Sequence, residues 1–364
     1  MSILKNLFSR KKTSHTPHTD FWKWFQQNER TFFKILKEKQ DVEHAFVNQV
    51  MQRLAALNEG LFLLAGMFND TTAELIVTAE GNVKNMVFAQ DLISEAPKLR
   101  HWRFTALKPP TDISAVSIQM DGGEFNSGNL CFYPNEHDRY PDEIDITVVH
   151  PELNKLNEKS IGHGVYLFLD NYLGELEFAT TIDNLTVKGP GSVKRETIPI
   201  GKLKDYLIWR QKEFIEKHDG VRHDTENDTH DLLEAELEDG SPLIAVINTD
   251  LLTWESKVSH PWILTVGIGY DGHSSNGMPD TRTSRLLEEI EGRLHARLKD
   301  FEGYLNIGRQ TADNLREIYF ACRDFRKPVK LLQKLTSDYR QKADIRFDIY
   351  KDKYWKTFER FTRH

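Results

Sequence analysis

The last third of the chain has the clearest alternation of hydrophobic and polar positions. Residues 263–270 alternate strictly, which predicts a strand, and residues 281–301 repeat apolar side chains every three or four positions, which predicts a helix. Glu288, Glu289 and Glu291 are expected on the solvent side of that helix. Its expected buried stripe is Leu287, Ile290, Leu294, Leu298 and Phe301.

Hairpin and helix signals on either side complete this pattern. Two hairpins are predicted: residues 232–236 with 243–248 around Asp239-Gly240, and residues 305–309 with 316–322 around Asp313-Asn314. A second helix is expected from Pro328, a strand over 345–349 and a closing helix over 354–361, with Asp352 as a helix N-cap. From residue 263 onward the order is β-α-β-β-α-β, which is the split βαβ or ferredoxin-like arrangement.

Residues 21–188 carry a looser mixture of the same signals. Gly162-His163-Gly164 is interpreted as a flexible entry to a helix. The order of elements predicts antiparallel sheets with helices on one face, so the fold class is α+β. Helices are expected over 21–36, 41–60, 84–95 and 164–173, and strands over 61–68, 74–78, 102–108, 115–120, 129–133, 144–149 and 178–187.

Composition shifts divide the chain into four predicted parts. Residues 1–20 form a basic tail that is expected to be disordered, 21–188 an α+β N-terminal module, 189–231 a linker with a bridging helix, and 232–364 a C-terminal domain. The alternative for the tail is a short amphipathic helix that rests on an anionic membrane surface. The polar segment 218–231 is rich in His and Asp and suggests a metal site, but it matches no ligand spacing and is interpreted as a solvated loop.

Charge and cysteine content exclude several classes of protein. The net charge of -7 over 364 residues is unfavourable for binding a nucleic-acid backbone, so no nucleic acid is expected as a partner. Cys131 and Cys322 are the only cysteines and form neither a disulfide framework nor a zinc pattern. No apolar run reaches the ~20 residues of a membrane span. We therefore expect a cytoplasmic protein without a cofactor or metal ion.

The C-terminal third contains a set of short motifs: Pro261-Trp262, Gly277-Met278-Pro279, Ile290-Glu291, Ile307-Gly308-Arg309-Gln310-Thr311, Arg316-Glu317-Ile318-Tyr319-Phe320, and Lys351-Asp352 followed by Trp355. By these motifs it resembles the bacterial family of unknown function DUF 695. The turn Ala312–Leu315 departs from the family, which usually has a Gly before its Arg-Glu pair. The first two-thirds is similar to the region that accompanies this domain in some Bacteroidetes proteins.

The resemblance implies regulation by protein contact, because family members are similar or joined to domains like the regulator of ribonuclease activity B. No nucleophile elbow, phosphate loop or dinucleotide fingerprint is present, and we assign no catalytic residue. The chain is therefore expected to be a non-enzymatic interaction or regulatory module with an unidentified protein partner. The alternative is a hydrolase with its site in the cleft between the two modules. The expected partner-binding residues are Asp271, His273, Asn276, Arg316 and Tyr319, around the polar loop 271–280.

Overall fold

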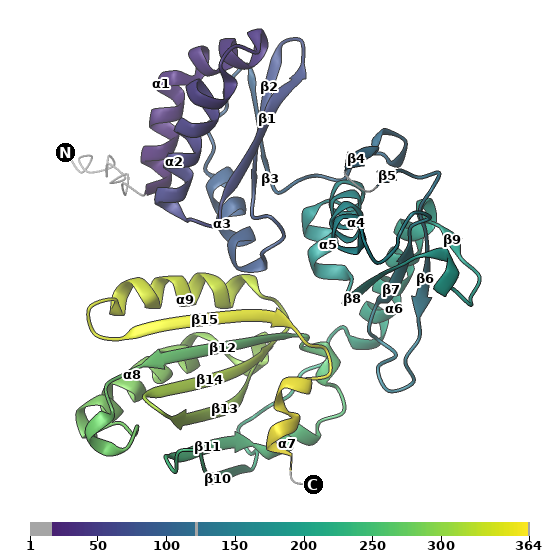
Figure 1. Cartoon of the computed structure of the whole chain (residues 1–364). Coiled ribbons are helices and arrows are strands. Elements are labelled where there is room, and N and C mark those ends of the chain that lie inside the picture. Colours follow the sequence, from purple (N-terminus) through teal and green to yellow (C-terminus); the bar gives the residue numbers. More distant parts are fainter. Residues whose placement is uncertain (1–16, 121–122, 363–364) are drawn as a thin grey trace, which may run out of the picture. The chain divides into compact units, whose positions relative to one another are not determined.

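The computed structural model describes residues 17–120 and 123–362 (Figure 1). Residues 17–80 and 88–108 form one compact unit, and residues 81–87 and 109–362 form a second. This division differs from the predicted one, which placed 21–188 in one module and 189–231 in a linker. Within these described ranges, no helix combines the length and apolar character that a membrane crossing needs.

In the first unit, helices that contain many aromatic residues pack on a three-stranded sheet of order β1-β2-β3. Its β2 and β3 are parallel, which corrects the antiparallel prediction, because a helical connection returns the chain in the same direction. The elements are α1 (Pro17–Glu38), a π-helical turn (Glu43–Val47), α2 (Asn48–Leu57), β1 (Phe62–Asn69), β2 (Thr72–Thr78), α3 (Val83–Ser94), part of which belongs to the second unit, and β3 (Trp102–Ala106).

The aromatic residues of α1 form the core of this unit. The ring of Phe25 is fully buried, and its centroid lies 4.8 Å from that of Trp102 and 5.4 Å from that of Phe104. On the edge strand β1, by contrast, Phe62, Leu64 and Phe68 are 40%, 46% and 53% exposed. The unit therefore has a packed aromatic core and an apolar, solvent-facing edge strand.

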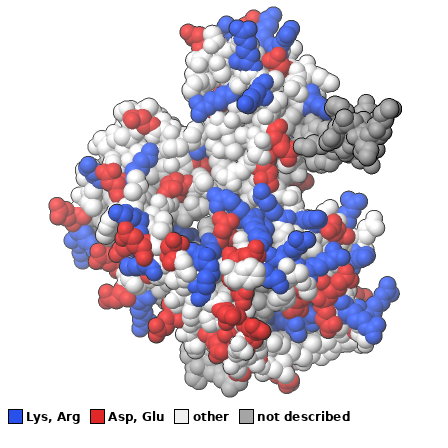
Figure 2. All heavy atoms as spheres, turned by 180° about the vertical axis from the view of Figure 1, so that it is seen from behind, with Lys and Arg blue, Asp and Glu red and all other residues white. Residues whose placement is uncertain are grey.

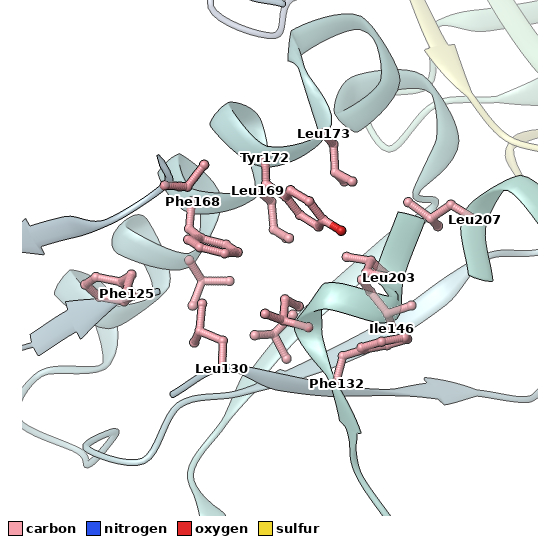
Figure 3. Packing of buried hydrophobic residues seen from close by; sticks show 14 of the residues in the cluster. Phe125, Leu130, Phe132, Ile146, Phe168, Leu169, Tyr172, Leu173, Leu203 and Leu207 are labelled. Carbon is pink, nitrogen blue, oxygen red and sulfur yellow. The ribbon is translucent and has the colours of Figure 1, made fainter. Parts of the chain in front are cut away.

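The second unit begins with a four-stranded sheet of order β8-β7-β6-β9, in which β7 and β8 are parallel. Figure 3 shows its core, where Phe168 and Tyr172 of one helix lie with Phe132 of the sheet and Leu203 of another helix. The segment predicted as a bridging helix is thus part of this core. The elements are β4 (Ile118–Met120), β5 (Gly123–Phe125), β6 (Cys131–Asn135), β7 (Asp145–Val149), α4 (Glu158–Leu173), α5 (Glu175–Thr181), β8 (Asn184–Lys188), β9 (Ile198–Pro199) and α6 (Leu203–His218).

Two local predictions in this part are wrong. The strand expected over 178–187 is helical up to Thr181, because Gly174, at φ 85°, ends α4 and lets α5 begin. His163 lies inside α4 and not at its entry. A glycine is needed next to it because a Cβ on Gly164 would collide with the buried ring of Phe125.

The rest of the second unit is a six-stranded antiparallel sheet of order β10-β11-β13-β14-β12-β15. The predicted order of elements from residue 263 onward is present, and the β10–β11 hairpin extends the sheet by pairing with β13. The elements are β10 (His230–Glu236), β11 (Pro242–Asn248), α7 (Thr249–Thr253), β12 (Trp262–Gly269), α8 (Thr281–Arg297), β13 (Tyr304–Ala312), β14 (Leu315–Cys322), α9 (Arg326–Tyr339), β15 (Asp344–Lys351) and a 3-10 helix (Lys356–Phe361).

Helices cover both faces of this sheet, whereas the prediction placed them on one. Helices α8 and α9 lie on one face, and α7 and the C-terminal 3-10 helix lie on the other (Figure 1). On the second face Ile263 packs in one cluster with Leu251 and Phe358. Because neighbours along a strand point to opposite faces, Leu264 faces α8 and α9.

The helix and turn predictions in this region are mostly confirmed. Ile290 and Leu294 of α8 are fully buried, but Phe301 lies beyond the end of the helix and is 70% exposed. The Asp313-Asn314 turn forms without glycine because both residues adopt positive φ, 42° and 63°, as a two-residue hairpin turn requires. Asp352 was predicted as a helix N-cap, but the N-cap of the 3-10 helix is Trp355. The Asp352 carboxylate, three residues earlier, still accepts from the backbone N–H groups of residues 356 and 357 at 3.0 and 2.9 Å.

Candidate functional site: a basic groove between two helices

The candidate site is a groove between helices α8 and α9, on the side of these helices that faces away from the six-stranded sheet. Each helix has an acidic residue at its start: Asp280 accepts from the backbone N–H of Thr283 at 2.7 Å, and Asp324 accepts from that of Arg326 at 2.8 Å. The two helices enclose a groove of about 600 Å³. We call it the basic groove; it is lined by Arg293, Ala296, Arg297, Lys327, Lys330, Leu331, Lys334, Leu335 and Asp338.

Positive charge dominates the lining of the basic groove. Five of its residues are Lys or Arg, and Asp338 is the one acidic residue among those that line it in the described part of the chain. The chain as a whole has a net charge of -7, so this concentration of cations is local. Figure 2 shows that Lys and Arg side chains also gather in groups on the face it presents, with acidic side chains between them.

The cations of the groove are spaced unfavourably for the helices that carry them. Arg293 and Arg297 are four residues apart on α8, and Lys330 is three or four residues from Lys327 and Lys334 on α9. Like charges at these spacings lie side by side and destabilise a helix by about 0.2–0.5 kcal/mol per pair. On α8 this cost is offset, because Arg293 pairs with Glu289 and Arg297 lies in the last turn, where a cation favours the helix dipole. The unfavourable spacing therefore applies mainly to the lysines of α9.

The position of α9 adds to the positive potential. Its first turn contains Lys327 and no acidic residue, although the amino end of a helix carries partial positive charge and favours anions. The carboxylate of Glu302 lies 2.6 Å from the Lys327 ammonium and offsets part of this charge. Within the described residues, Arg297 and Lys334 have no ion-pair partner and are exposed to solvent. These two side chains are the cations best placed to meet a negative group from outside.

One end of the groove is held in place by hydrogen bonds. The hydroxyl of Tyr339 donates to Glu289 at 2.6 Å, and the guanidinium of Arg293 lies 5.0 Å from the centroid of the Tyr339 ring. Burial and this hydrogen bond raise the pKa of Tyr339 to about 12, and the same bond lowers the pKa of Glu289. The tyrosine is therefore neutral and the carboxylate charged near neutral pH, which keeps Arg293 against the groove.

The loop predicted to bind a partner lies at the other end of α8. Asp271, His273 and Asn276 are exposed there, and the loop is tied to the β13–β14 turn, since Asn314 accepts from the backbone N–H of Gly272 at 2.9 Å. Twelve residues of helix separate the start of α8 from Arg293, which corresponds to about 18 Å. The structure therefore does not bring the loop and the basic groove together.

Arg316 and Tyr319, the other two predicted partner-binding residues, are buried. They are 8% and 1% exposed and point to opposite faces of the sheet, because they are three residues apart on β14. Arg316 Nε donates to Thr311 at 3.1 Å, and the hydroxyl of Tyr319 donates to Glu317 at 3.0 Å. Neither side chain is available to a partner in this conformation.

The acidic partner of Arg316 is Glu291, which was expected on the solvent side of α8 and is only 7% exposed. Its carboxylate lies 2.8 Å from Arg309 Nη1 and 3.7 Å from Arg316 Nη1. Burial alone would raise the pKa of Glu291, but hydrogen bonds from His295 and Arg309 and the charge of Arg316 hold it below its usual value. Glu291 and Arg316 form a buried ion pair under α8, and the half-buried Arg309 binds the same carboxylate.

Among residues 17–120 and 123–362, no group of three or more His, Cys, Asp or Glu side chains is arranged to hold a metal ion. In the polar segment 218–231, His223 lies 2.8 Å from Asp228, which also accepts from Asn248 at 2.7 Å. These contacts join the segment to β11.

The like-charge spacing along each helix was visible in the sequence. By itself it does not indicate a site, because a run of charges on one helix is usually only a solvated face. The two helices are separated by two strands in the sequence, so only the fold shows that their cations share a groove.

Residues 235–362 match the model of a family of unknown function, DUF695. This confirms the resemblance in the C-terminal third of the chain, and the basic groove lies inside the matched segment. No curated protein and no solved structure matches the chain.

Proposed function

We propose that this chain is a non-enzymatic interaction module that binds an acidic segment of a partner protein in the basic groove. The observation that carries the proposal is the concentration of five Lys and Arg residues around a groove of about 600 Å³ on a chain of net charge -7. A field of this kind attracts a complementary charge and repels like charge, which gives a binding site its specificity.

The occupant is proposed to be a peptide because of the shape of the groove. Leu331 and Leu335 of α9 add apolar side chains to its lining. An acidic segment with a few apolar side chains can use both features, as peptides do in helix-lined grooves. A nucleic acid would instead need a broad basic surface that follows its backbone, and the negative net charge of the chain opposes that.

The scaffold is suited to such a role. We infer that β12, α8, β13, β14, α9 and β15 form the ferredoxin-like arrangement, in which the two helices pack side by side on one face of the sheet. Side chains on rigid helices hold a binding surface more precisely than those on loops. The exposed apolar edge strand β1 in the first unit is a further feature typical of interaction proteins.

The test is a titration of the full chain with a labelled Glu-rich peptide that contains Leu residues. Replacing Arg297 and Lys334 together by Gln should weaken binding at least about tenfold, because each loses a full charge next to the peptide. The matched control replaces Arg282 and Arg285 by Gln. It also removes two positive charges, but from exposed positions at the start of α8, outside the groove. The control should bind like the unaltered chain.

Folding can be separated from binding in this experiment. The groove variant relieves like-charge repulsion within the helices, so its melting temperature should stay the same or rise. Equal loss in the groove variant and the control would refute the proposal. Binding of single-stranded RNA but not the peptide, with the same dependence on Arg297 and Lys334, would replace it with a nucleic-acid site.

The hydrolase alternative gains no support from the geometry. A hydrolase of this kind needs a nucleophilic side chain next to a general base, in a cleft between the predicted modules. The described pocket that joins those parts of the sequence, near Trp262, has hydroxyl groups only from Thr180 and Thr181 in its lining. The Thr181 hydroxyl donates to Glu177 at 2.7 Å and accepts from Gln211 at 2.6 Å, so it is held in a structural hydrogen-bond network. We therefore do not propose a hydrolase.

A further inference from the structure

The edge strand β1 of the first unit leaves one side of its backbone without a partner strand. Among the described residues it pairs with β2 and with no other strand, so every second backbone N–H and C=O group points away from the sheet. None of its eight residues is buried, whereas Ala73, Leu75 and Val77 of β2 are fully buried. The open edge is therefore accessible to another strand.

Strand β1 also lacks the charged residues that normally keep an edge strand from pairing. No Lys, Arg, Asp or Glu occurs between Phe62 and Asn69. The two edge strands of the six-stranded sheet differ in this respect, because three acidic residues lie on β10 and four charged residues lie on β15. Of these three edges, β1 is the one that no charge protects.

The exposed side chains of β1 lie on the face of the sheet that points away from α1. Leu75 pairs with Phe104, which contacts Phe25 of α1, so the α1 face is the one that carries Leu75. Leu64 pairs with Ile76, the next residue on β2, and therefore lies on the opposite face. Phe62, Leu64 and Gly66 share that face, and a Cβ at Gly66 would meet no atom within 4 Å.

We propose that β1 pairs antiparallel with β1 of a second copy of this chain, so that the sheets of two first units become continuous. Pairing about Leu64 places this residue opposite its counterpart and places Phe62 of each copy opposite Gly66 of the other. The open space at Gly66 leaves room for the Phe62 ring. The register shift between Met67 and Asn69 ends the regular part of the strand, so the pairing covers residues 62–66.

The chemistry of the strand favours a second copy over another partner. A charged segment would find no counter-charge along β1, whereas a second β1 is neutral and apolar. The large Phe62 and the small Gly66 are also equally far from Leu64 in the sequence, which makes the strand complementary to itself about a twofold axis. The contact is much smaller than the roughly 20–30 residues per side of a standard interface, so we expect a micromolar dissociation constant.

The test is sedimentation equilibrium of the full chain at concentrations up to about 200 μM, where a micromolar dimer is populated. Leu64→Lys places two ammonium groups opposite each other and should weaken the dimer at least about tenfold. The matched control is Leu232→Lys, the same change at an exposed position on the edge strand β10, and it should leave the dimer intact. Both positions are exposed, so neither change should lower the melting temperature appreciably.

Cross-linking tests the position of the twofold axis. Leu64→Cys should form a disulfide between two copies in oxidised glutathione, because the two Cα atoms lie within the distance that a disulfide spans. Phe68→Cys is the matched control on the same strand. Its two copies would be eight residues apart along the paired strands, about 26 Å, and should not cross-link.

Salt separates this contact from the basic groove. Added salt should leave the dimer intact, because the paired residues carry no charge, whereas it should weaken peptide binding in the groove. A monomer at every concentration, a dimer that Leu64→Lys leaves intact or that salt dissociates, or equal cross-linking at positions 64 and 68 would overturn the proposal. Dimerisation only after removal of residues 1–16 would assign the strand to that segment and would also overturn it. None of these outcomes bears on the basic groove, whose residues lie in the second unit.

Discussion

Glu291→Ala should destabilise the chain more than any other single carboxylate change on α8. Glu291 and Arg316 are 7% and 8% exposed, and the shortest distance between their charged groups is 3.7 Å. Removing the carboxylate leaves the Arg316 guanidinium buried with only Thr311 as a hydrogen-bond partner. Breaking a buried ion pair in this way costs about 3–5 kcal/mol. That is a large part of the free energy of unfolding of a typical domain, which is about 5–15 kcal/mol.

The assay is urea unfolding of the full chain followed by circular dichroism, together with hydrogen exchange of β13 and β14. Hydrogen exchange is needed because a chain with two compact units need not unfold in one step. Glu288→Ala is the matched control, since this side chain is exposed on the same helix, and it should cost under about 0.5 kcal/mol.

A double variant tests the physical reason. Replacing Glu291 by Leu and Arg316 by Met removes both charges, and it should recover most of the stability that Glu291→Ala loses, because neither group is then left unpaired. A cost below about 1 kcal/mol for Glu291→Ala, or a double variant as unstable as the single one, would refute the reasoning.

Three further predictions follow from the same structure. The stability that Glu291 contributes should be fully present above its unfolded pKa, near 4.5, and should be lost as the pH falls through its lower folded pKa. The difference in unfolding free energy between the native chain and Glu291→Gln should therefore shrink in acid. Leu294→Ala should cost about 2–5 kcal/mol in urea unfolding, whereas the exposed Arg293→Ala should cost under about 0.5 kcal/mol; similar costs at the two positions would contradict the observed orientation of α8. Asp352→Ala should cost about 0.5–2 kcal/mol, because it removes the acceptor for two backbone N–H groups, and Asp352→Asn should retain most of the stability.

Local periodicity explains which parts of the fold were predictable. The buried stripe of α8 and the Asp313-Asn314 turn depend on residues that are neighbours in the sequence, and both were predicted. The strand expected at Phe178 failed because its apolar pattern fits a short helix equally well, and the break at Gly174 decides between them. The parallel pairing of β2 with β3 follows from the helix that connects them, and the predicted strand–helix–strand order contained this signal although the sheet was expected to be antiparallel.

The candidate site was less predictable because it depends on contacts between distant residues. Glu291 was placed in solvent by its position on α8, but two arginines on neighbouring strands of the sheet reach under the helix and make its burial favourable. Arg316 was expected to bind a partner because it neighbours the polar loop 271–280, but its guanidinium lies under α8 near Glu291. The basic groove requires α8 and α9 to lie side by side, and the residues between them give no sign of it.

The most direct test of the proposed function is a charge swap in the basic groove. Replacing Arg297 and Lys334 by Glu leaves three cations facing three carboxylates in the groove, so it should abolish binding of the Glu-rich peptide, which salt should weaken in the unaltered chain. We expect this loss when the two chains are measured in parallel by fluorescence anisotropy. Retention of the Glu-rich peptide by the swapped chain would show that the peptide binds elsewhere and would contradict the proposal.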